Sequence, residues 1–444
     1  MSQSPSADRE RLAASMRAIA SQLFLHALSE ATVEKAFDRH VNCDRGVLRV
    51  CEDLYDLQSF SRTVVISIGK AAHSMLDALL NQVGGSVEGI VASPLDPASQ
   101  VHGFRYFRGG HPIPNSESIR AAEAMLKTAA VQNTASFVIY LISGGGSACA
   151  EKPIDAEISL QDLIATYQVL VLSGAPIAEI NAVRKHLSGI KGGRLAAAAH
   201  PAQQVSILVS DVPDSSPDAL ASGPTMPDST TVEDCHRIVA AYGLAPQFPA
   251  SVRELFDRHA LEETPKSDDP TFHRSRWWTI LSNKAIVESV SEEAKRLSFT
   301  VEVDDSCDDW DYEATAEYLV NRVRELRKKY ARVCLISGGE STVKVQNGGV
   351  GGRNQQLVLA MAARIAGENI TVLSAGTDGI DGNSLAAGAI ADGTTIARAQ
   401  LRGLNPQTSL AKFDAYPFFD SIGDAIVIGP TGNNLRDVRI LLAY

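Results

Sequence analysis

The sequence lacks the patterns that are typical of proteins with structural metal sites, of secreted proteins and of membrane-spanning proteins. Its six cysteines form no CxxC pair and have no histidine at zinc-site spacing, which predicts free thiols in a reducing compartment. No run approaches the roughly 18 apolar residues that a membrane span needs. The first residues are polar and lack the apolar core of a signal peptide.

Basic residues are also in short supply. The chain has 41 lysines and arginines against 52 aspartates and glutamates, a formal net charge of −11. Nucleic acids and anionic membranes require a basic surface, so neither is expected as a partner. We expect a cytoplasmic protein whose partners are small molecules. The sequence leaves the oligomeric state open, with a homodimer as one option.

Several familiar catalytic signatures are absent as well. No stretch matches the GxxxxGK[ST] phosphate loop, and the HRD and DFG motifs of protein kinases are missing. A hydride-transfer enzyme should show GxGxxG after a strand and an acidic residue about 20 positions further on. The glycines at 144–146 lack that spacing, and Ser147 lies in GGGSA rather than in the GxSxG of a hydrolase. These absences disfavour dehydrogenases and hydrolases and exclude two common kinase classes.

The length of the chain and its repeated pattern predict two α/β domains. A chain of 444 residues is too long for one ordinary core, and we place the boundary so that the domains are 1–250 and 251–444. In both halves, apolar runs end in glycine loops and lead into helical patterns, which is typical of βα units. We therefore expect a Rossmann-like first domain with helices on both faces of a largely parallel sheet. The second α/β domain should also have a largely parallel sheet, with a last strand over 424–428 and a short terminal helix.

The densest group of candidate site residues lies between Arg332 and Gly393. An apolar run at 333–336 ends in the loop 337–341, and a second glycine loop at 348–352 precedes Arg353 at the start of a predicted helix. Glycines let backbone N–H groups approach a ligand, and a helix N-terminus carries partial positive charge. The planar guanidinium of Arg353 suits phosphate or carboxylate. The stretch therefore predicts an anion site.

The first half contains a similar junction between a predicted strand and a glycine loop. Leu-Ile-Ser-Gly-Gly occurs at 141–145 and again at 335–339, so both domains use the same strand-to-glycine-loop junction. Three glycines followed by serine at such a junction more often line a small ligand than close a simple turn. Lys70 follows a predicted strand at a helix start, where a lysine is disfavoured unless an anion neutralises it. The alternative is an ordinary solvated lysine. His111, in a rigid loop, suits a structural hydrogen bond at least as well as catalysis.

Carboxylates and further cations complete the set of candidates. Asp211, Asp214, Asp378 and Asp381 follow predicted strands and could hold a hard cation or only stabilise turns. A magnesium site needs about one or two carboxylates, so four oversupply it. A basic cluster beside Gly192 and Gly193 could be a helix surface, which we accept for Lys185, or could face an anionic ligand. Its members are Arg184, Lys185, His186, Lys191 and Arg194.

Taken together, the motifs resemble the class II glycerate 2-kinases, which have an N-terminal glycerate-kinase domain and a C-terminal MOFRL-type domain. The match runs from Ser67 to Arg439 and contains, in order, SIGKAA, GGHPIPN, LISGGGSA, INAVRKHLSGIKGGRLA, SDVP, ASGPT, LISGGEST, GGRNQQLVLA, SAGTDGIDG and GPTGNN. The resemblance implies ATP-dependent phosphorylation of D-glycerate at its 2-hydroxyl, with Mg²⁺, in an active-site cleft between the two domains. It also implies that Lys70 and Arg353 are catalytic.

The chain departs from this family at two points. Relatives commonly have Gly-Asp-Asp after Ser-Asp-Val-Pro, where this chain has Asp-Ser-Ser at 214–216. Relatives often have threonine at the position of Asn433. Both departures concern nucleotide or metal contacts rather than the class of reaction.

The resulting hypothesis assigns a role to each candidate. Lys70, Arg353 and Asp211 are predicted to be catalytic, and Asp211 and Asp378 are the predicted magnesium ligands. Glycerate or nucleotide is predicted to contact Ser143, Gly144, Gly145, Gly146, Ser147, Arg184, Lys191, Ser222, Gly338, Gly339, Glu340, Gly352, Asn354 and Asp378. Two alternatives stay open: an NAD(P)H-dependent hydroxypyruvate reductase and a non-catalytic protein that binds small anions.

Overall fold

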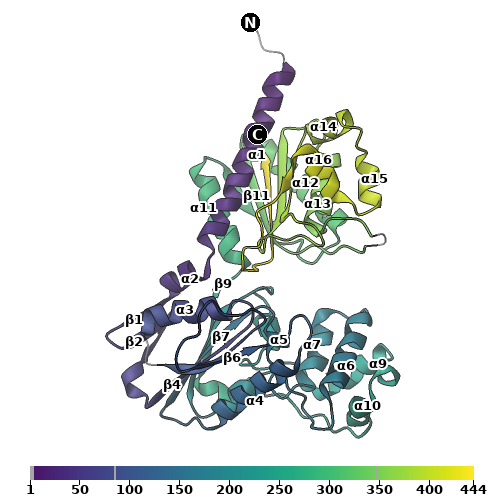
Figure 1. Cartoon of the computed structure of the whole chain (residues 1–444). Helices are drawn as coiled ribbons and strands as arrows, with labels where there is room; N and C mark the ends of the chain where they lie inside the picture. The colour runs from purple at the N-terminus through teal and green to yellow at the C-terminus, as the bar shows by residue number, and fades with distance from the viewer. Residues whose placement is uncertain (1–4, 85–86, 346–347) are drawn as a thin grey trace. The chain divides into compact units, whose positions relative to one another are not determined.

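The computed structural model describes residues 5–84, 87–345 and 348–444 (Figure 1). The chain divides into two compact units, one comprising Val33–Ile280 and the other Met1–Thr32 with Leu281–Tyr444. This division differs from the predicted boundary at 250/251, because the last part of the first sheet and its flanking helices extend to residue 280. The first 32 residues also belong with the C-terminal half. The predicted cleft between the domains stays a prediction.

The unit Val33–Ile280 is built on a six-stranded sheet in the order β6-β5-β4-β7-β8-β9. The pairs β4–β5, β4–β7, β5–β6 and β7–β8 are parallel, which confirms the predicted Rossmann-like first sheet. All eight residues of β7 are buried, because helices cover both faces of the sheet. The strands are β4 (Arg62–Ile68), β5 (Glu88–Ser93), β6 (Phe104–Arg108), β7 (Ser136–Ser143), β8 (Gln203–Val209) and β9 (Ser275–Leu281).

Two helical layers and a helical subcluster surround this sheet. α3 (Ala72–Val83) packs on β4, β5 and β7, while α4 (Ser116–Ala130) and α8 (Arg194–Ala199) pack into the cluster on the other face. A separate apolar cluster joins α6 (Leu160–Leu172), α7 (Ile177–His186), α9 (Val232–Ala241) and α10 (Ala250–Asp257). α9 and α10 therefore pack on the helices before them, which explains why the boundary lies beyond 250. The remaining elements are α2 (Val33–His40), the antiparallel strands β1 (Val41–Asp44), β2 (Val47–Val50) and β3 (Asp53–Asp56), and the short α5 (Gly146–Cys149).

The other unit contains a sheet in the order β10-β11-β15-β12-β13-β14. β10 and β11 are parallel, but every other neighbouring pair is antiparallel, so the prediction of a largely parallel second sheet was wrong. The predicted terminal helix is strand β15, which lies between β11 and β12 and is buried along its whole length. The strands are β10 (Thr300–Val303), β11 (Val333–Gly339), β12 (Ile370–Gly376), β13 (Gly388–Asp392), β14 (Ala425–Ile426) and β15 (Asp437–Ala443).

Helices cover both faces of this second sheet. α1 (Pro5–Glu30) lies along it beside α11 (Asn283–Arg296) and contacts β12, β13 and β15 (Figure 1). The buried face of α1 includes Met16, Leu23 and Phe24. Burial of this apolar surface holds α1 in the C-terminal unit, although the residues that directly follow α1 in the chain belong to the other unit. α12 (Tyr312–Lys329) and α13 (Arg353–Arg364) share the apolar cluster of the other face. The remaining helices are α14 (Thr395–Leu401), α15 (Pro406–Ala411) and α16 (Ala415–Ile422). Among the described residues, no helix is both long and apolar enough to span a bilayer.

Candidate functional site

Two loops at the carboxyl ends of β4 and β7 are joined by backbone hydrogen bonds. The N–H of Lys70 donates to the carbonyl oxygen of Gly144 at 2.9 Å, and the N–H of Ala71 donates to Oγ of Ser143 at 3.0 Å. Gly69 has φ of +118°, and a methyl group there would lie 2.4 Å from the Ser143 carbonyl oxygen. Only glycine fits this approach. The two neighbouring parallel strands thus fix Lys70 beside the glycine loop that follows β7.

Three polar side chains converge on the glycine pair at 144 and 145. A methyl group on Gly145 would lie 2.6 Å from Cδ2 of His111 and 3.2 Å from Cγ of Lys70. A methyl group on Gly144 would lie 2.0 Å from Oδ2 of Asp211. The structure therefore brings together Lys70 and Asp211, both predicted to be catalytic, with His111, whose role the sequence left open.

The electrostatics of this cluster favour an anionic ligand. Lys70 is exposed, and within the described parts of the chain no carboxylate forms an ion pair with its ammonium group. Burial, with a contribution from the nearby Lys70 charge, lowers the pKa of His111. The imidazole is therefore neutral near pH 7. The exposed, unpaired ammonium group of Lys70, in a chain with net charge −11, attracts a phosphate or carboxylate group.

Two predicted binding serines lie at the edge of the same loop. Oγ of Ser147, in α5, lies 2.8 Å from Oγ of Ser222. Ser222 and its neighbour Ala221 have positive φ angles of 59° and 51°, a backbone conformation that non-glycine residues rarely adopt. Such strain persists where surrounding structure holds it and often accompanies ligand sites.

The basic cluster proved to be largely internal. Lys191 is buried and forms an ion pair with Glu151, which also accepts a hydrogen bond from Tyr167 at 2.8 Å. Burial lowers the pKa of Lys191. The guanidinium of Arg184 lies 4.9 Å from the centre of the Tyr167 ring. A ligand role for Lys191 stays a prediction without a free cation to support it. Arg184 stays a candidate, because its buried Nε has no hydrogen-bond partner among the described residues.

Lys185 was assigned to an ordinary surface, and that assignment was wrong. It is 3% exposed, and its ammonium donates to Asp218 at 2.6 Å and to Asp228 at 3.2 Å. A buried lysine needs such partners because an isolated charge in the interior is costly. No local pattern indicates this burial, because the partners of Lys185 lie 33 and 43 residues away along the chain.

In the second unit, two carboxylates hold Arg353 at the start of α13. Nε and Nη2 donate to the two oxygens of Asp437 at 2.6 and 3.0 Å, and Nη2 donates to Oε1 of Glu340 at 2.9 Å. Burial opposes the charge, but Asp437 and Glu340 outweigh it and hold the pKa of Arg353 above its usual range. The side chain is only partly buried, so its remaining N–H groups stay available as oriented donors.

The glycine loop after β11 is filled by the protein itself. The N–H of Gly338 donates to Asp305 at 2.6 Å, that of Gly339 to Asn283 at 3.2 Å, and that of Glu340 to Asp308 at 2.9 Å. We expected this loop to cradle ligand oxygens. These three N–H groups are occupied instead. The loop reaches the surroundings of Arg353 through the side chain of Glu340, which accepts from the guanidinium, and through Ser341, which lines the cavity there.

The N-terminus of α13 also has an internal occupant. Oδ1 of Asp381 accepts the N–H of Asn354 at 3.1 Å, and Oδ2 accepts that of Gln355 at 2.8 Å. A methyl group on Gly352 would lie 2.2 Å from Oδ1 of Asp381. The predicted anion at this helix start is therefore the chain's own carboxylate. Burial raises the pKa of Asp381 to about 6, despite these hydrogen bonds.

The two predicted magnesium ligands are single carboxylates. Asp211 lies against Gly144 in one unit, while Oδ1 of Asp378 accepts the N–H of Ile380 at 3.1 Å within a turn of the other. Over 5–84, 87–345 and 348–444, no group of three or more histidines, cysteines or acids is arranged to hold a metal ion. This donor chemistry fits magnesium, which binds through one or two carboxylates, phosphates and water rather than in an all-protein cage.

Sequence reasoning missed two buried arginines at the start of the last strand, Arg436 directly before β15 and Arg439 within it. Arg436 donates to Asp308 at 2.7 Å, and Arg439 donates to the carbonyl oxygen of Gly338 at 2.9 Å. Both arginines are almost fully buried. We had predicted a short terminal helix here. The apolar run that follows it, 440–443, was the signal for a strand.

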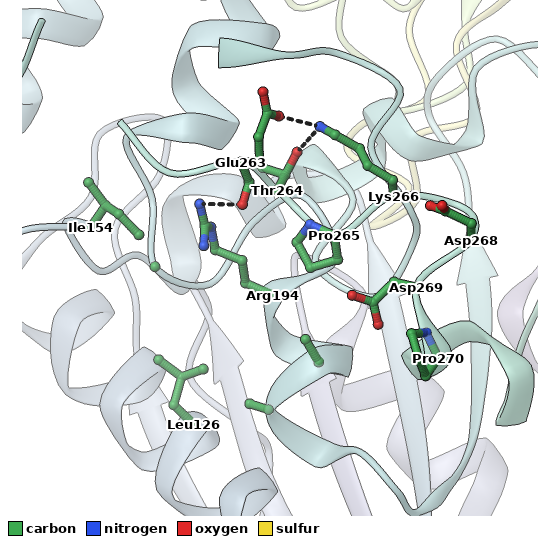
Figure 2. Close-up of a pocket in the computed structure, with 13 residues that line it drawn as sticks. Leu126, Ile154, Arg194, Glu263, Thr264, Pro265, Lys266, Asp268, Asp269 and Pro270 are labelled. Carbon is green, nitrogen blue, oxygen red and sulfur yellow. Dashed lines mark hydrogen bonds and ion pairs between the residues drawn. The ribbon is translucent and has the colours of Figure 1, made fainter. Parts of the chain in front are cut away.

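Each unit contains a cavity formed by described residues. One, of about 440 Å³, lies beside Arg353 and is walled by Val343, Phe413 and the glycine loop 348–352. The other, of about 700 Å³, lies between α8 and the segment 263–270 (Figure 2). Lys266 there is paired with Glu263 at 2.8 Å, and Arg194 donates to the Glu263 carbonyl oxygen at 3.4 Å (Figure 2). The polar groups of this second cavity are thus largely bound to one another.

Comparison with known proteins places this geometry in a family. Residues 19–257 match the family described as "Domain of unknown function (DUF4147)", and residues 333–437 match the MOFRL family. The chain is 34% identical to a D-glycerate 2-kinase from Thermotoga maritima, over 86% of the chain and 91% of that relative. It is also 34% identical to a glycerate 2-kinase from Pyrococcus horikoshii, over 86% of the chain and 87% of that relative.

A solved structure agrees with this result over nearly the whole chain. The crystal structure of glycerate kinase from Thermotoga maritima matches with a TM-score of 0.84 and 30% identity, covering 97% of this chain and all of that one. Two further relatives carry hydroxypyruvate reductase as a provisional name. These relatives and the matching structure show an α/β kinase that combines DUF4147 and MOFRL regions. The chain belongs to the glycerate kinase family.

Proposed function

We propose that the protein transfers the γ-phosphoryl group of ATP to the 2-hydroxyl of D-glycerate, giving 2-phosphoglycerate and ADP. The observation that carries this proposal is the 34% identity, over 86% of the chain, to a relative named D-glycerate 2-kinase. The unpaired ammonium of Lys70 and the oriented guanidinium of Arg353 supply the cations that such a reaction needs. We also propose a cytoplasmic location, in keeping with six free cysteines.

In the proposed step, the protein positions the two substrates and stabilises the charge of the phosphoryl group, and it forms no covalent bond itself. The 2-hydroxyl oxygen of glycerate forms a bond to the γ-phosphorus, and the bond from that phosphorus to the oxygen of the ADP leaving group breaks. The hydroxyl proton passes to a carboxylate, for which Asp211 and Asp378 are the candidates; whichever of them holds magnesium is not the base, because coordination to the cation lowers its basicity. Magnesium, bound with ATP, would neutralise phosphate charge, and Asp211 and Asp378 are the residues proposed to hold it.

Lys70 and Arg353 would act through fixed positive charge. Lys70 is held at a strand end by the 2.9 Å hydrogen bond from its N–H to Gly144, so its side chain starts from a defined point. Arg353 is oriented by Asp437 and Glu340 before any ligand arrives. Charge that is oriented in advance costs no reorganisation when the transition state forms.

A direct product assay tests the proposal. Purified protein would be incubated with ATP, Mg²⁺ and D-glycerate, and ADP and the phosphoglycerate isomers would be resolved by NMR. A parallel reaction would contain NADH and hydroxypyruvate. We expect 2-phosphoglycerate and ADP without NADH oxidation. NADH oxidation without ADP would instead support the reductase, and binding of these anions without either reaction would support a non-catalytic protein.

A further inference from the structure

The guanidinium of Arg353 has five N–H groups, and the protein itself accepts hydrogen bonds from three of them. Nε–H and one N–H of Nη2 donate to the two oxygens of Asp437, at 2.6 and 3.0 Å. The second N–H of Nη2 donates to Oε1 of Glu340 at 2.9 Å. The two N–H groups of Nη1 have no acceptor among the described residues, and Nη1 is not a buried atom. The donors that remain for a ligand therefore lie on Nη1.

A planar guanidinium can bind an oxyanion through two different pairs of donors. The first pair is Nε–H with one N–H of Nη2, and Asp437 occupies it. The second, terminal pair consists of the outer N–H groups of Nη1 and Nη2, which point the same way and match two oxygens of a carboxylate or phosphate. Glu340 occupies the Nη2 half of this terminal pair. An oxyanion can therefore bind the terminal pair with two hydrogen bonds only after Glu340 has left it.

The charge around Arg353 also opposes a ligand anion while Glu340 is in place. Two carboxylates, Asp437 and Glu340, are paired with the single positive charge of Arg353. An arriving anion is attracted by the guanidinium and repelled by Glu340 at short range. If the Glu340 side chain turns away, this repulsion weakens and the terminal pair becomes available in the same movement.

The two carboxylates differ in how easily they can move. The side chain of Asp437 is 1% exposed, and its residue begins β15, which is paired with Gly339 on one side and Gly376 on the other. The side chain of Glu340 is 32% exposed, and its backbone N–H is held by Asp308 at 2.9 Å. The Glu340 side chain can therefore turn into water without a movement of its loop, and water stabilises the released carboxylate. Asp437 stays in place and keeps the guanidinium oriented.

We propose that Glu340 occupies the anion position of Arg353, and that a phosphoryl or carboxylate group of a substrate displaces it and binds Nη1 and Nη2 together. The inference rests on the proposed kinase function, because the displacing group belongs to ATP or to D-glycerate. Arg353 lines the cavity of about 440 Å³, so a ligand in this cavity lies next to the residue. Glu340 then sets the affinity of this position, because every anion that binds there competes with the Glu340 carboxylate.

Glu340→Gln tests the displacement by enzyme kinetics. The variant keeps the size of the side chain and loses its negative charge, so an anion displaces it more easily. We expect KM for ATP or KM for D-glycerate to fall by about fivefold or more, a factor between the value of an exposed ion pair and that of a charged hydrogen bond. A lower KM for ATP identifies a phosphoryl group as the displacing group, and a lower KM for D-glycerate identifies the carboxylate. If turnover continues and both KM values stay unchanged or rise, the displacement is overturned and the kinase assignment stands.

Glu368→Gln is the matched control. Glu368 pairs with Arg324 at 2.5 Å in the same unit and is 37% exposed, close to the value for Glu340. We expect this control to leave both KM values within about twofold, because salt screens the loss of a distant exposed charge. Glu340→Asp keeps the charge but shortens the side chain, and it should also lower the affected KM. A Glu340→Asp variant identical to the wild type, beside a Glu340→Gln variant with a lower KM, would show that charge rather than the contact limits binding and would overturn the displacement.

Crystal structures of the unaltered protein test the same movement without any variant. Crystals would be soaked with inorganic phosphate and, separately, with D-glycerate. We expect at least one of these anions on Nη1 and Nη2, with the Glu340 carboxylate turned away and both bonds to Asp437 unchanged. If neither anion displaces Glu340 from Nη2, the proposal is overturned. Displacement of Glu340 in a protein that shows no kinase turnover would support this inference and overturn the kinase assignment.

Discussion

Leu-Ile-Ser-Gly-Gly ends a buried strand in each unit, but the glycines of the two copies have different contacts. After β7, the glycines at 144 and 145 lie against the side chains of Asp211, His111 and Lys70, and the lysine stays exposed. After β11, the N–H groups of 338–340 are bound by carboxylate and amide oxygens of the same chain. The first loop is a candidate ligand site, and the second is a structural junction.

The strands beside β7 and β11 also differ in direction. β7 lies between two parallel strands, so only the loops at their carboxyl ends meet beside it. β11 lies beside the antiparallel β15, which pairs Gly339 with Asp437 and brings the charged start of the last strand next to the glycine loop. The same five residues therefore predict a strand that ends in a glycine loop, but they do not predict which groups bind the N–H groups of that loop.

Loss of Lys70 should have the largest effect on function. We expect Lys70→Ala to lower kcat/KM for glycerate phosphorylation by about 10³-fold, because a preorganised charge at the transferring group is removed. The side chain is exposed, so the free energy of unfolding should change by less than about 0.5 kcal/mol. Steady-state kinetics and thermal unfolding would measure both. Lys127→Ala, which removes an exposed lysine of α4, is the control, and near-normal turnover of the Lys70 variant would refute the assignment.

The internal anion of α13 should make stability depend on pH. Because the folded pKa of Asp381 is about 6 and the usual value is 3.8, the folded state binds more protons between these values. The stabilising contribution is therefore complete below about pH 4 and is lost as the pH rises through 6, by up to about 3 kcal/mol.

Asp381→Asn isolates this contribution. Denaturant unfolding of both proteins at several values between pH 4 and pH 7 should show the stability of the wild type falling, relative to the variant, as the pH rises. A difference that stays constant over this range would mean that the donors at the helix start keep the carboxyl group ionised.

Equivalent glycines in the two loops should respond differently to alanine. A methyl group on Gly338 would lie 1.9 Å from Oδ1 of Asn283, whose amide also donates to two backbone carbonyl oxygens, so it cannot move away freely. We expect Gly338→Ala to lower the free energy of unfolding by about 2 kcal/mol. Gly144→Ala would instead displace the partly exposed Asp211, with a smaller loss of stability and a fall in kcat/KM of about tenfold or more. Equal losses of stability in the two variants would remove the distinction between an open and a filled loop.

The smallest effect should come from the serine of the first loop. Oγ of Ser143 accepts the N–H of Ala71 at 3.0 Å and so joins the loops after β4 and β7. Ser143→Ala should cost about 1 kcal/mol of stability, the usual value of one buried hydrogen bond, and raise KM modestly through a less ordered Lys70. Chemical denaturation and steady-state kinetics would check both, and a variant as stable as the wild type would show that other contacts align the loops.

Much of the fold could be predicted from local patterns. The strand-to-glycine junctions after β4, β7 and β11 and the helix after Gly352 lie where the apolar periodicity placed them. The extent of the first unit could not be predicted, because α9 and α10 join it only through packing on α6 and α7. β15 was also missed, since a strand that is buried on both faces and begins with charged residues does not show regular alternation.

The candidate site was only partly accessible to the same reasoning. The positions of Lys70 and Arg353 beside glycine loops before predicted helices could be found from the sequence alone. The buried pairs of Lys185 and Lys191 do not, because the partner acids lie 33 to 43 residues away along the chain.

The sequence by itself determined the order of βα units, the glycine junctions and the two cations that begin helices, because each depends on residues within a few positions of one another. Only the tertiary structure decided which backbone N–H groups stay available to a ligand. The acceptors that fill the second loop, Asp305, Asn283 and Asp308, lie 32 to 56 residues from their donors. A buried donor must be satisfied, but packing alone determines whether the acceptor is a ligand or the protein itself.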